Sequence, residues 1–121
     1  MATNDKAVTI APYFKVHNGK LEAFRSLCER FVEMTRTESK CLYYGFSSDG
    51  DQWFCREGYQ DADGLLVHLE HVGALLSELL KIADLTRLEV HGAEEELAKL
   101  RQPLADFKPQ FFRLEYGFRR G

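Results

Sequence analysis

The feature that most constrains the fold is a tight-turn signal between two aromatic runs. Residues 41–47 and 52–59 both have the aromatic content typical of β-strands, and Ser48-Asp49-Gly50-Asp51 joins them. Asp-Gly between such runs favours a two-residue hairpin turn, because both central residues need positive φ. With Asp49-Gly50 as the turn, Phe46 lies opposite Trp53, Tyr44 opposite Cys55, and Leu42 opposite Glu57. One face of the hairpin then carries Leu42, Tyr44, Phe46, Trp53, Cys55, Glu57 and Tyr59.

The flanking segments place this hairpin in a larger topology. Alternation over residues 7–16 predicts a strand, and apolar residues spaced by three and four predict helices over 21–34 and 61–83, the second interrupted at Gly73. Residues 85–91 indicate a further strand. The order is β-α-β-β-α-β, so we expect a ferredoxin-like α+β fold, with an antiparallel sheet and two helices on one face.

A helix over residues 93–105 and an aromatic strand over 110–119 follow these elements. No stretch of the chain is long enough to act as a linker between domains. The sequence therefore predicts one domain over residues 1–121, with a core at 7–91 and a C-terminal helix-and-strand extension at 93–119.

Composition excludes several classes of protein. The chain has 16 Lys plus Arg against 19 Asp plus Glu, and 45% of its residues are hydrophobic. It should therefore fold, and it lacks the basic character that nucleic acids or anionic membranes require. No run approaches the ~20 apolar residues of a membrane span, and residues 1–6 are too polar for a signal peptide. We expect a cytoplasmic protein, with Cys28, Cys41 and Cys55 as unpaired buried thiols.

Adjacent aromatic residues occur on four of the predicted strands. The pairs are Tyr13-Phe14, Tyr43-Tyr44, Trp53-Phe54 and Phe111-Phe112. Neighbouring residues of a strand point to opposite faces, so both faces of the sheet carry apolar side chains. Helices on one side leave the other face bare, and we expect a homodimer that buries it sheet against sheet.

Four short features of the core form a known pattern. The first strand ends near Gly19, Cys41-x-Tyr43 opens the second, Glu57 lies near the end of the third, and His68-Leu69 lies early in the second helix. Over about residues 7–91 this layout resembles the antibiotic biosynthesis monooxygenase superfamily of dimeric α/β barrels. Two features depart from it, namely Tyr59, where many members have Trp, and the extension at 93–119.

The resemblance implies the fold more strongly than the reaction. The superfamily includes cofactor-free oxygenases of phenolic or quinol rings, heme-degrading oxygenases and proteins without known activity. In the heme-degrading branch the pocket Asn, Trp and axial His would fall at Pro12, His68 and Glu78, so none of them is kept. Glutamate is also a poor axial ligand, so we expect no heme and no other cofactor.

His68 is the candidate catalytic residue. It lies at the edge of the apolar stripe of its helix, where its ring could reach a cavity between helix and sheet. There it could take a phenolic proton and generate an anion that reacts directly with dioxygen. The alternative is a boundary histidine that is hydrogen-bonded to a neighbour. A metal site at His68 and His71 with Glu70 or His91 is disfavoured, since the spacing lacks the i, i+4 geometry of helical zinc motifs.

Four further residues are candidates for a substrate pocket. Tyr44, Trp53 and Tyr59 could form an aromatic wall, and Arg56, which has no evident carboxylate partner, could hold an anionic group of a substrate. Each of them could equally be a packing residue of the core or the dimer face. The sequence thus leaves two hypotheses open: a cofactor-independent monooxygenase acting on a small aromatic or quinol-like molecule, or a non-catalytic homodimer that binds a small ligand or has a structural function.

Overall fold

Five strands form one mixed sheet in the order β2-β3-β1-β4-β5. The computed structural model describes residues 3–121. The strands are β1 Val8–Val16, β2 Cys41–Asp49, β3 Gln52–Tyr59, β4 Ala83–Gly92 and β5 Gln110–Arg113. The helices are α1 Leu21–Thr35, α2 Ala62–His71, α3 Gly73–Leu79 and α4 Glu94–Leu100, followed by a 3₁₀ turn at Ala105–Phe107.

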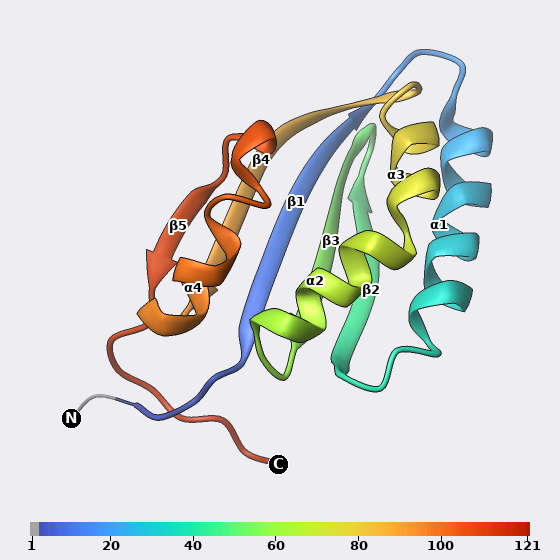
Figure 1. Cartoon of the computed structure of the whole chain (residues 1–121). Helices are drawn as coiled ribbons and strands as arrows, with labels where there is room; N and C mark the ends of the chain where they lie inside the picture. Colours follow the sequence, from blue (N-terminus) through green and yellow to red (C-terminus); the bar gives the residue numbers. More distant parts are fainter. Residues whose placement is uncertain (1–2) are drawn as a thin grey trace.

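The first four strands have the ferredoxin-like arrangement. β1 lies between β3 and β4 and pairs with both of them antiparallel, and β2 pairs antiparallel with β3. β5 is added at the outer edge of β4 and runs parallel to it. Figure 1 shows the helices on one face of this sheet. The expected ferredoxin-like α+β fold is confirmed.

The β2–β3 hairpin turns one residue later than predicted. Asp49 pairs with Gln52, so the central residues of the turn are Gly50 and Asp51. Of these two, Gly50 has a positive φ of 65° and Asp51 does not, which is the pattern of a type II′ turn. From Tyr43 to Asp49, each residue of β2 therefore has a partner two positions away from the predicted one. A shift by two positions leaves side chains on their predicted faces.

A bulge changes the beginning of β2. The register shifts between Cys41 and Tyr43, because β2 has one extra residue there. As a result Cys41 packs beneath the helices, whereas Leu42 is 37% exposed. The prediction that Leu42 shares a face of the hairpin with Tyr44 and Phe46 is wrong for this reason.

The predicted helix over residues 61–83 is divided into α2 and α3. The break is at Val72, with φ −101° and ψ 7°, and α3 begins at Gly73, the residue expected to interrupt the helix. This break lets the two short helices follow different directions across the sheet (Figure 1). None of the helices within residues 3–121 combines the length and the apolar character needed to cross a bilayer.

The extension has less regular structure than predicted. α4 ends at Leu100 rather than near Ala105, and β5 ends at Arg113 rather than at Arg119. Residues 114–121 are neither helix nor strand. The side chains of Tyr116 and Phe118 are consequently 74% and 80% exposed instead of packing on the sheet.

α4 is nevertheless part of the core. Buried side chains form two clusters, and the second one joins Leu97, Leu100 and Leu104 to Val8 of β1 and Val90 of β4. All three leucines are at most 1% exposed. The extension therefore buries apolar surface of β1 and β4 that the ferredoxin-like elements alone would leave open.

The helix-free face of the sheet carries one residue of each aromatic pair. Tyr13 lies against Phe54 with ring centroids 4.8 Å apart, and Phe112 stacks on His91 at 4.6 Å. The neighbour of Tyr13 in sequence, Phe14, is buried beneath the helices on the other face. The predicted division of the aromatic pairs between two faces is thus confirmed.

Packing of α4 into the core can be tested with Leu97→Ala. This change should lower the free energy of unfolding by about 2–5 kcal/mol, because it leaves a cavity around a fully buried position. Leu42→Ala removes the same atoms from an exposed side chain and should cost less than about 1 kcal/mol. Urea unfolding measures both values, and equal losses would contradict the described packing.

Candidate functional site

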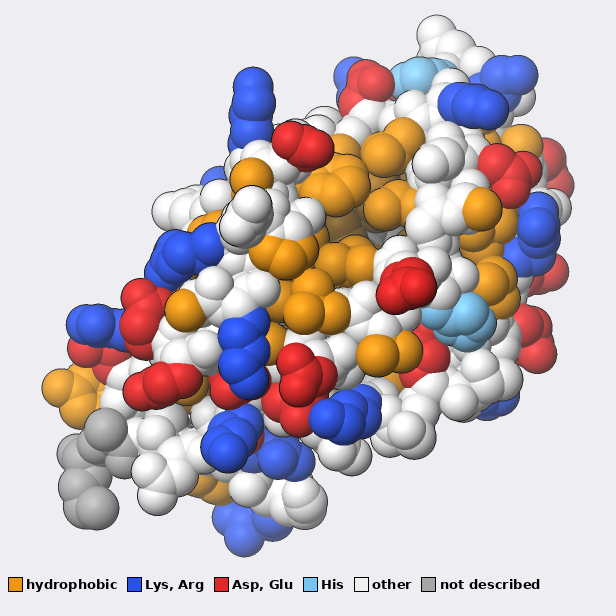
Figure 2. All heavy atoms as spheres, viewed as in Figure 1, with side chains coloured by type: hydrophobic (Ala, Val, Ile, Leu, Met, Phe, Trp, Pro, Cys, Tyr) orange, Lys and Arg blue, Asp and Glu red, His pale blue; other side chains and the backbone are white. Residues whose placement is uncertain are grey.

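A pocket opens between the helices and the sheet. Figure 2 shows hydrophobic side chains around a hollow, which lies over β1 and β4 between α4 and α3. The cavity has a volume of about 60 Å³, several times the ~10–15 Å³ that one water molecule needs. Apolar side chains form most of the wall, among them Ile10, Phe14, Phe31, Leu69, Val72, Leu76, Leu88, Leu104 and Phe107. The polar groups in the wall are Tyr44, Cys55, Glu57 and His68.

His68 lies between two buried carboxylates. Its Nδ1 is 3.0 Å from both side-chain oxygens of Glu38, which comes from the loop between α1 and β2. Its Nε2 is 3.5 Å from Oε1 of Glu57 on β3. The three side chains are only 4–7% exposed. A carboxylate at Nδ1 favours the neutral tautomer with the proton on Nδ1, which leaves the Nε2 lone pair free on the Glu57 side.

Burial moves the proton affinities of Glu57 and His68 toward each other. The pKa of Glu57 is raised to about 7, because burial opposes its charge more than the hydrogen bonds from Tyr59 and Cys55 favour it. The Tyr59 hydroxyl donates to Glu57 Oε1 at 2.7 Å. The pKa of His68 is lowered by its burial, and nearby Glu38 opposes part of this shift. At neutral pH His68 is therefore unprotonated and able to accept a proton.

Local contacts fix the helix that carries His68. The Asp61 carboxylate caps α2 by accepting the Gly64 N–H at 2.9 Å. Glu96 of α4 accepts the Ala62 N–H at 2.9 Å, and its side chain is buried. Two carboxylates thus hold the N-terminus of α2, where the helix dipole favours negative charge. Since α4 belongs to the extension, the extension helps to set the position of His68.

The residues expected in the pocket are separated by the fold. Tyr44 lines the pocket, with its ring centroid 5.3 Å from that of His68. Tyr59 is fully buried beside His68, and its hydroxyl bonds Glu57 rather than facing the cavity. Trp53 does not line the pocket. It belongs to the first of the two core clusters, where it packs against Phe24. The helix-free face carries Arg56, whose guanidinium stacks over the Tyr43 ring at 4.4 Å.

Sequence reasoning left out two residues of the site. Glu57 entered only as a marker of the resemblance, although a carboxylate on the apolar face of the hairpin was itself a signal of a buried acid. Glu38 had no such signal, because it lies in a loop and reaches His68 only through the folded arrangement of α1 and α2. Without Glu38, the sequence could not indicate how the His68 ring is oriented.

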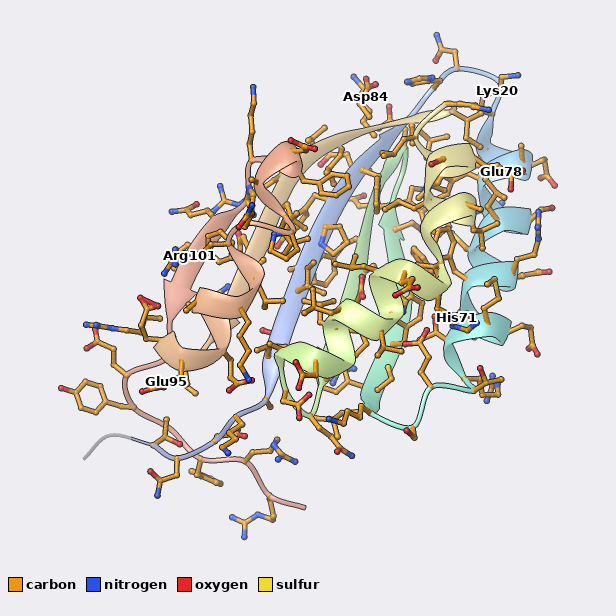
Figure 3. All side chains as sticks on the ribbon, viewed as in Figure 1. Lys20, His71, Glu78, Asp84, Glu95 and Arg101 are labelled. Atoms are coloured by element: carbon orange, nitrogen blue, oxygen red, sulfur yellow. The ribbon has the colours of Figure 1, made fainter. Side chains whose placement is uncertain are left out.

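Metal and heme ligation find little support in the side-chain geometry. Within residues 3–121, no group of three or more His, Cys, Asp or Glu side chains is arranged to hold a metal ion. His68 and His71 instead both direct Nδ1 to the Glu38 carboxylate. Glu78, at the position of the heme ligand, is about half-exposed and lies 4.0 Å from Arg30 (Figure 3).

The raised pKa of Glu57 predicts a dependence of stability on pH. The folded chain keeps this proton up to about pH 7, whereas an ordinary glutamate loses it near 4.5. Between these values Glu57 binds its proton in the native state but not in the unfolded state, so its contribution to wild-type stability falls as pH rises. Glu57→Gln removes this effect and should gain on the order of 3 kcal/mol relative to wild type between pH 4 and pH 8.

Urea unfolding of wild type and Glu57→Gln at several pH values measures this difference. Glu89→Gln is the matched control, because Arg87 and His91 lower the pKa of Glu89 instead of raising it. That variant should show no gain between pH 5 and pH 8. A Glu57→Gln difference that stays constant with pH would contradict a buried, protonated Glu57.

Comparison with solved structures identifies the relatives of this chain. MupZ from Pseudomonas fluorescens is 49% identical, with a TM-score of 0.94 over 99% of this chain and 94% of that one. A proposed antibiotic biosynthesis monooxygenase from Nitrosomonas europaea has a TM-score of 0.68 at 16% identity, over 78% and 96% of the two chains. Another from Caulobacter crescentus CB15 has a TM-score of 0.66 at 17% identity, over 74% and 91%. No protein-family model and no curated protein matches the chain.

The matches differ in how much of the chain they cover. The alignment with MupZ takes in nearly the whole chain, whereas those with the two more distant proteins leave about a quarter of it unmatched. At such low identity the distant pair supports the fold alone. With 49% identity over nearly its whole length, the chain belongs to the family of MupZ, and it has the ferredoxin-like fold of proteins named antibiotic biosynthesis monooxygenases.

Proposed function

We propose that this protein is a cofactor-independent monooxygenase acting on a small, neutral phenolic or quinol-like ring. The observation that carries the proposal is the orientation of His68: Glu38 contacts Nδ1, whereas Nε2 lies at the apolar pocket, 3.5 Å from Glu57 Oε1 and without a hydrogen bond to it. A neutral imidazole in this position is a general base for an acidic hydroxyl. Burial away from water strengthens its interaction with the charge that develops on the substrate.

The reaction needs no electron donor other than the substrate. Nε2 of His68 takes the proton of a phenolic hydroxyl, and the electron-rich anion reduces dioxygen and binds it at a ring carbon that carries hydrogen. The resulting peroxide anion takes the proton back from His68. Loss of water, which removes the hydrogen on that carbon, leaves a carbonyl group. One oxygen atom enters the product, the other leaves as water, and the substrate supplies all four electrons.

The charges at the pocket favour a neutral substrate. None of the pocket-lining residues within the described part of the chain is Lys or Arg. Glu57 lies in the wall, and Glu38 lies directly behind His68. An anionic group would therefore lose its hydration without gaining a cationic partner. Arg56 cannot supply a cationic partner, because it lies on the other face of the sheet. The contact between Arg56 and an anionic group of a substrate is therefore not part of this proposal.

Oxygen consumption with neutral hydroquinones and anthrones tests the activity. His68→Gln should lower the rate by about 10²–10⁴-fold, because the amide can still donate to Glu38 but cannot accept the proton. His91→Gln is the control, since His91 is partly exposed on the helix-free face. The substrate's absorption spectrum separates binding from reaction. Ligands that bind without ionisation or oxygen uptake would indicate a binding protein instead, and equal rates in both variants would remove His68 from the mechanism.

We also infer that the protein is a homodimer joined through the helix-free sheet faces. Aromatic rings such as Tyr13 and Phe54 lie on this face without a covering helix, and self-association would bury them. Sedimentation should then give twice the chain mass of 14.0 kDa at micromolar concentration.

The Tyr13–Phe54 pair provides the matched test of this interface. Phe54→Arg places a charge on the inferred contact surface and should shift the sedimentation mass toward the monomer. Val67→Arg places the same charge on an exposed position of α2 and should leave the dimer intact. A wild-type mass near that of a single chain would contradict the dimer.

A further inference from the structure

Four ionisable side chains form a continuous series that runs along α2 from the pocket to the protein surface. Glu57 lies at the pocket, His68 and Glu38 follow, and His71 at the end of α2 completes the series. We propose that this series transfers protons between the buried site and solvent, with His71 as its outlet. Its use in turnover rests on the proposed function, whereas its existence as a path for protons does not.

The contacts have the geometry that such a series needs. Nε2 of His68 is 3.5 Å from Glu57 Oε1, Nδ1 of His68 is 3.0 Å from Glu38 Oε2, and Nδ1 of His71 is 2.7 Å from the same Glu38 oxygen. The last two distances are hydrogen bonds. The first is longer than a hydrogen bond, so a small approach of the His68 ring to Glu57 must precede transfer there.

Exposure rises abruptly at the last member. The side chains of Glu57, His68 and Glu38 are 4–7% exposed, whereas that of His71 is 35% exposed. Figure 3 shows His71 where α2 approaches the C-terminal end of α1. His71 is therefore the member of the series that exchanges readily with water.

An imidazole passes a proton by accepting it on one nitrogen and releasing another from the second. With His71 in the neutral tautomer that carries its proton on Nε2, transfer outward moves one proton from Glu57 to Nε2 of His68, the Nδ1 proton of His68 to Glu38, and one proton from Glu38 to Nδ1 of His71. His71 then releases a proton to water from Nε2. Each step breaks one bond to hydrogen and forms another, and the net result is one proton delivered from the pocket to solvent.

The other ionisable groups around the series are poor carriers. Tyr59 and Cys55 face Glu57, and Tyr44 faces His68. Burial and the charge of Glu57 raise the pKa of all three, so they stay protonated. Cys41 lies near Glu38, and burial raises the pKa of its thiol to about 11. One competing outlet exists at Glu38, which also lines a second hollow beside β2.

Exchange of the His68 ring N–H with water tests the series without any ligand. In protein with ¹⁵N-labelled histidine at neutral pH, His71→Gln should slow this exchange by at least about tenfold. Glutamine can still donate a hydrogen bond to Glu38, so the contact is kept and only the transfer is lost. Added free imidazole should restore the rate in His71→Gln. His17→Gln is the control, because His17 is an exposed histidine paired with Asp84 outside the series.

Glu38→Gln interrupts the same series in its buried part. It should slow the exchange as His71→Gln does, but free imidazole should not restore it, because the amide side chain next to His68 cannot take up the proton and pass it on. The backbone amide spectrum reports whether each variant keeps its fold. Loss of a purely structural contact at His71 would not be reversed by imidazole, so that result would also overturn the proposal.

If the exchange rate is unchanged in His71→Gln, His71 is not the outlet, and protons leave the series through the hollow beside β2 instead. This result does not affect the proposed oxygenase, whose test is oxygen uptake. Conversely, slowed and rescued exchange in a protein that consumes no oxygen supports the proton path while the oxygenase proposal fails. The two proposals are therefore separated by experiment.

Discussion

The burial of Glu38, His68 and Glu57 beneath one helix is the constraint on which the site depends. Moving a carboxylate out of water costs several kcal/mol unless partners replace its hydration. Here the His68 ring contacts both carboxylates, and Tyr59 donates to Glu57. This mutual compensation requires His68 to stay between two different elements, the loop after α1 and strand β3. Any rotation or shift of α2 would leave a buried charge without a partner.

The extension provides part of the restraint on α2. Glu96 from α4 holds the first turn of α2, and leucines of the same region complete the core over β1 and β4. Leu104 and Phe107 also line the pocket. The segment after β4 therefore acts on the site twice, by fixing the helix that carries His68 and by closing the cavity next to it. The extension thus contributes to the site of a chain whose ferredoxin-like core is already complete at Gly92.

Local patterns predicted the layers of this fold better than its contacts. The predicted register of the hairpin was wrong, because Gly50 occupies the first turn position instead of the second. The pairing moved by two residues, so most side chains still lie on their predicted faces. Gly73 correctly indicated the break after α2. The bulge at Leu42 has no signal in the alternating pattern, so its exposure could not be foreseen. Glu38 and Arg56 illustrate the same limit, since the partner of each is decided by how distant segments pack and not by neighbours in sequence.

The chemistry of the site follows from one physical effect acting on two kinds of group. Burial disfavours charge, so it raises the pKa of an acid and lowers that of a base. For Glu57 and His68 the two shifts point toward each other, with Glu57 at about 7 and His68 below its ordinary value. In the folded protein Glu57 therefore holds its proton more tightly than His68 does. In water the order is the opposite, because the pKa of an ordinary histidine lies about two units above that of an ordinary glutamate. The apolar pocket is thus more than a container for a substrate, because burial in it also leaves the His68 ring able to accept a proton at neutral pH.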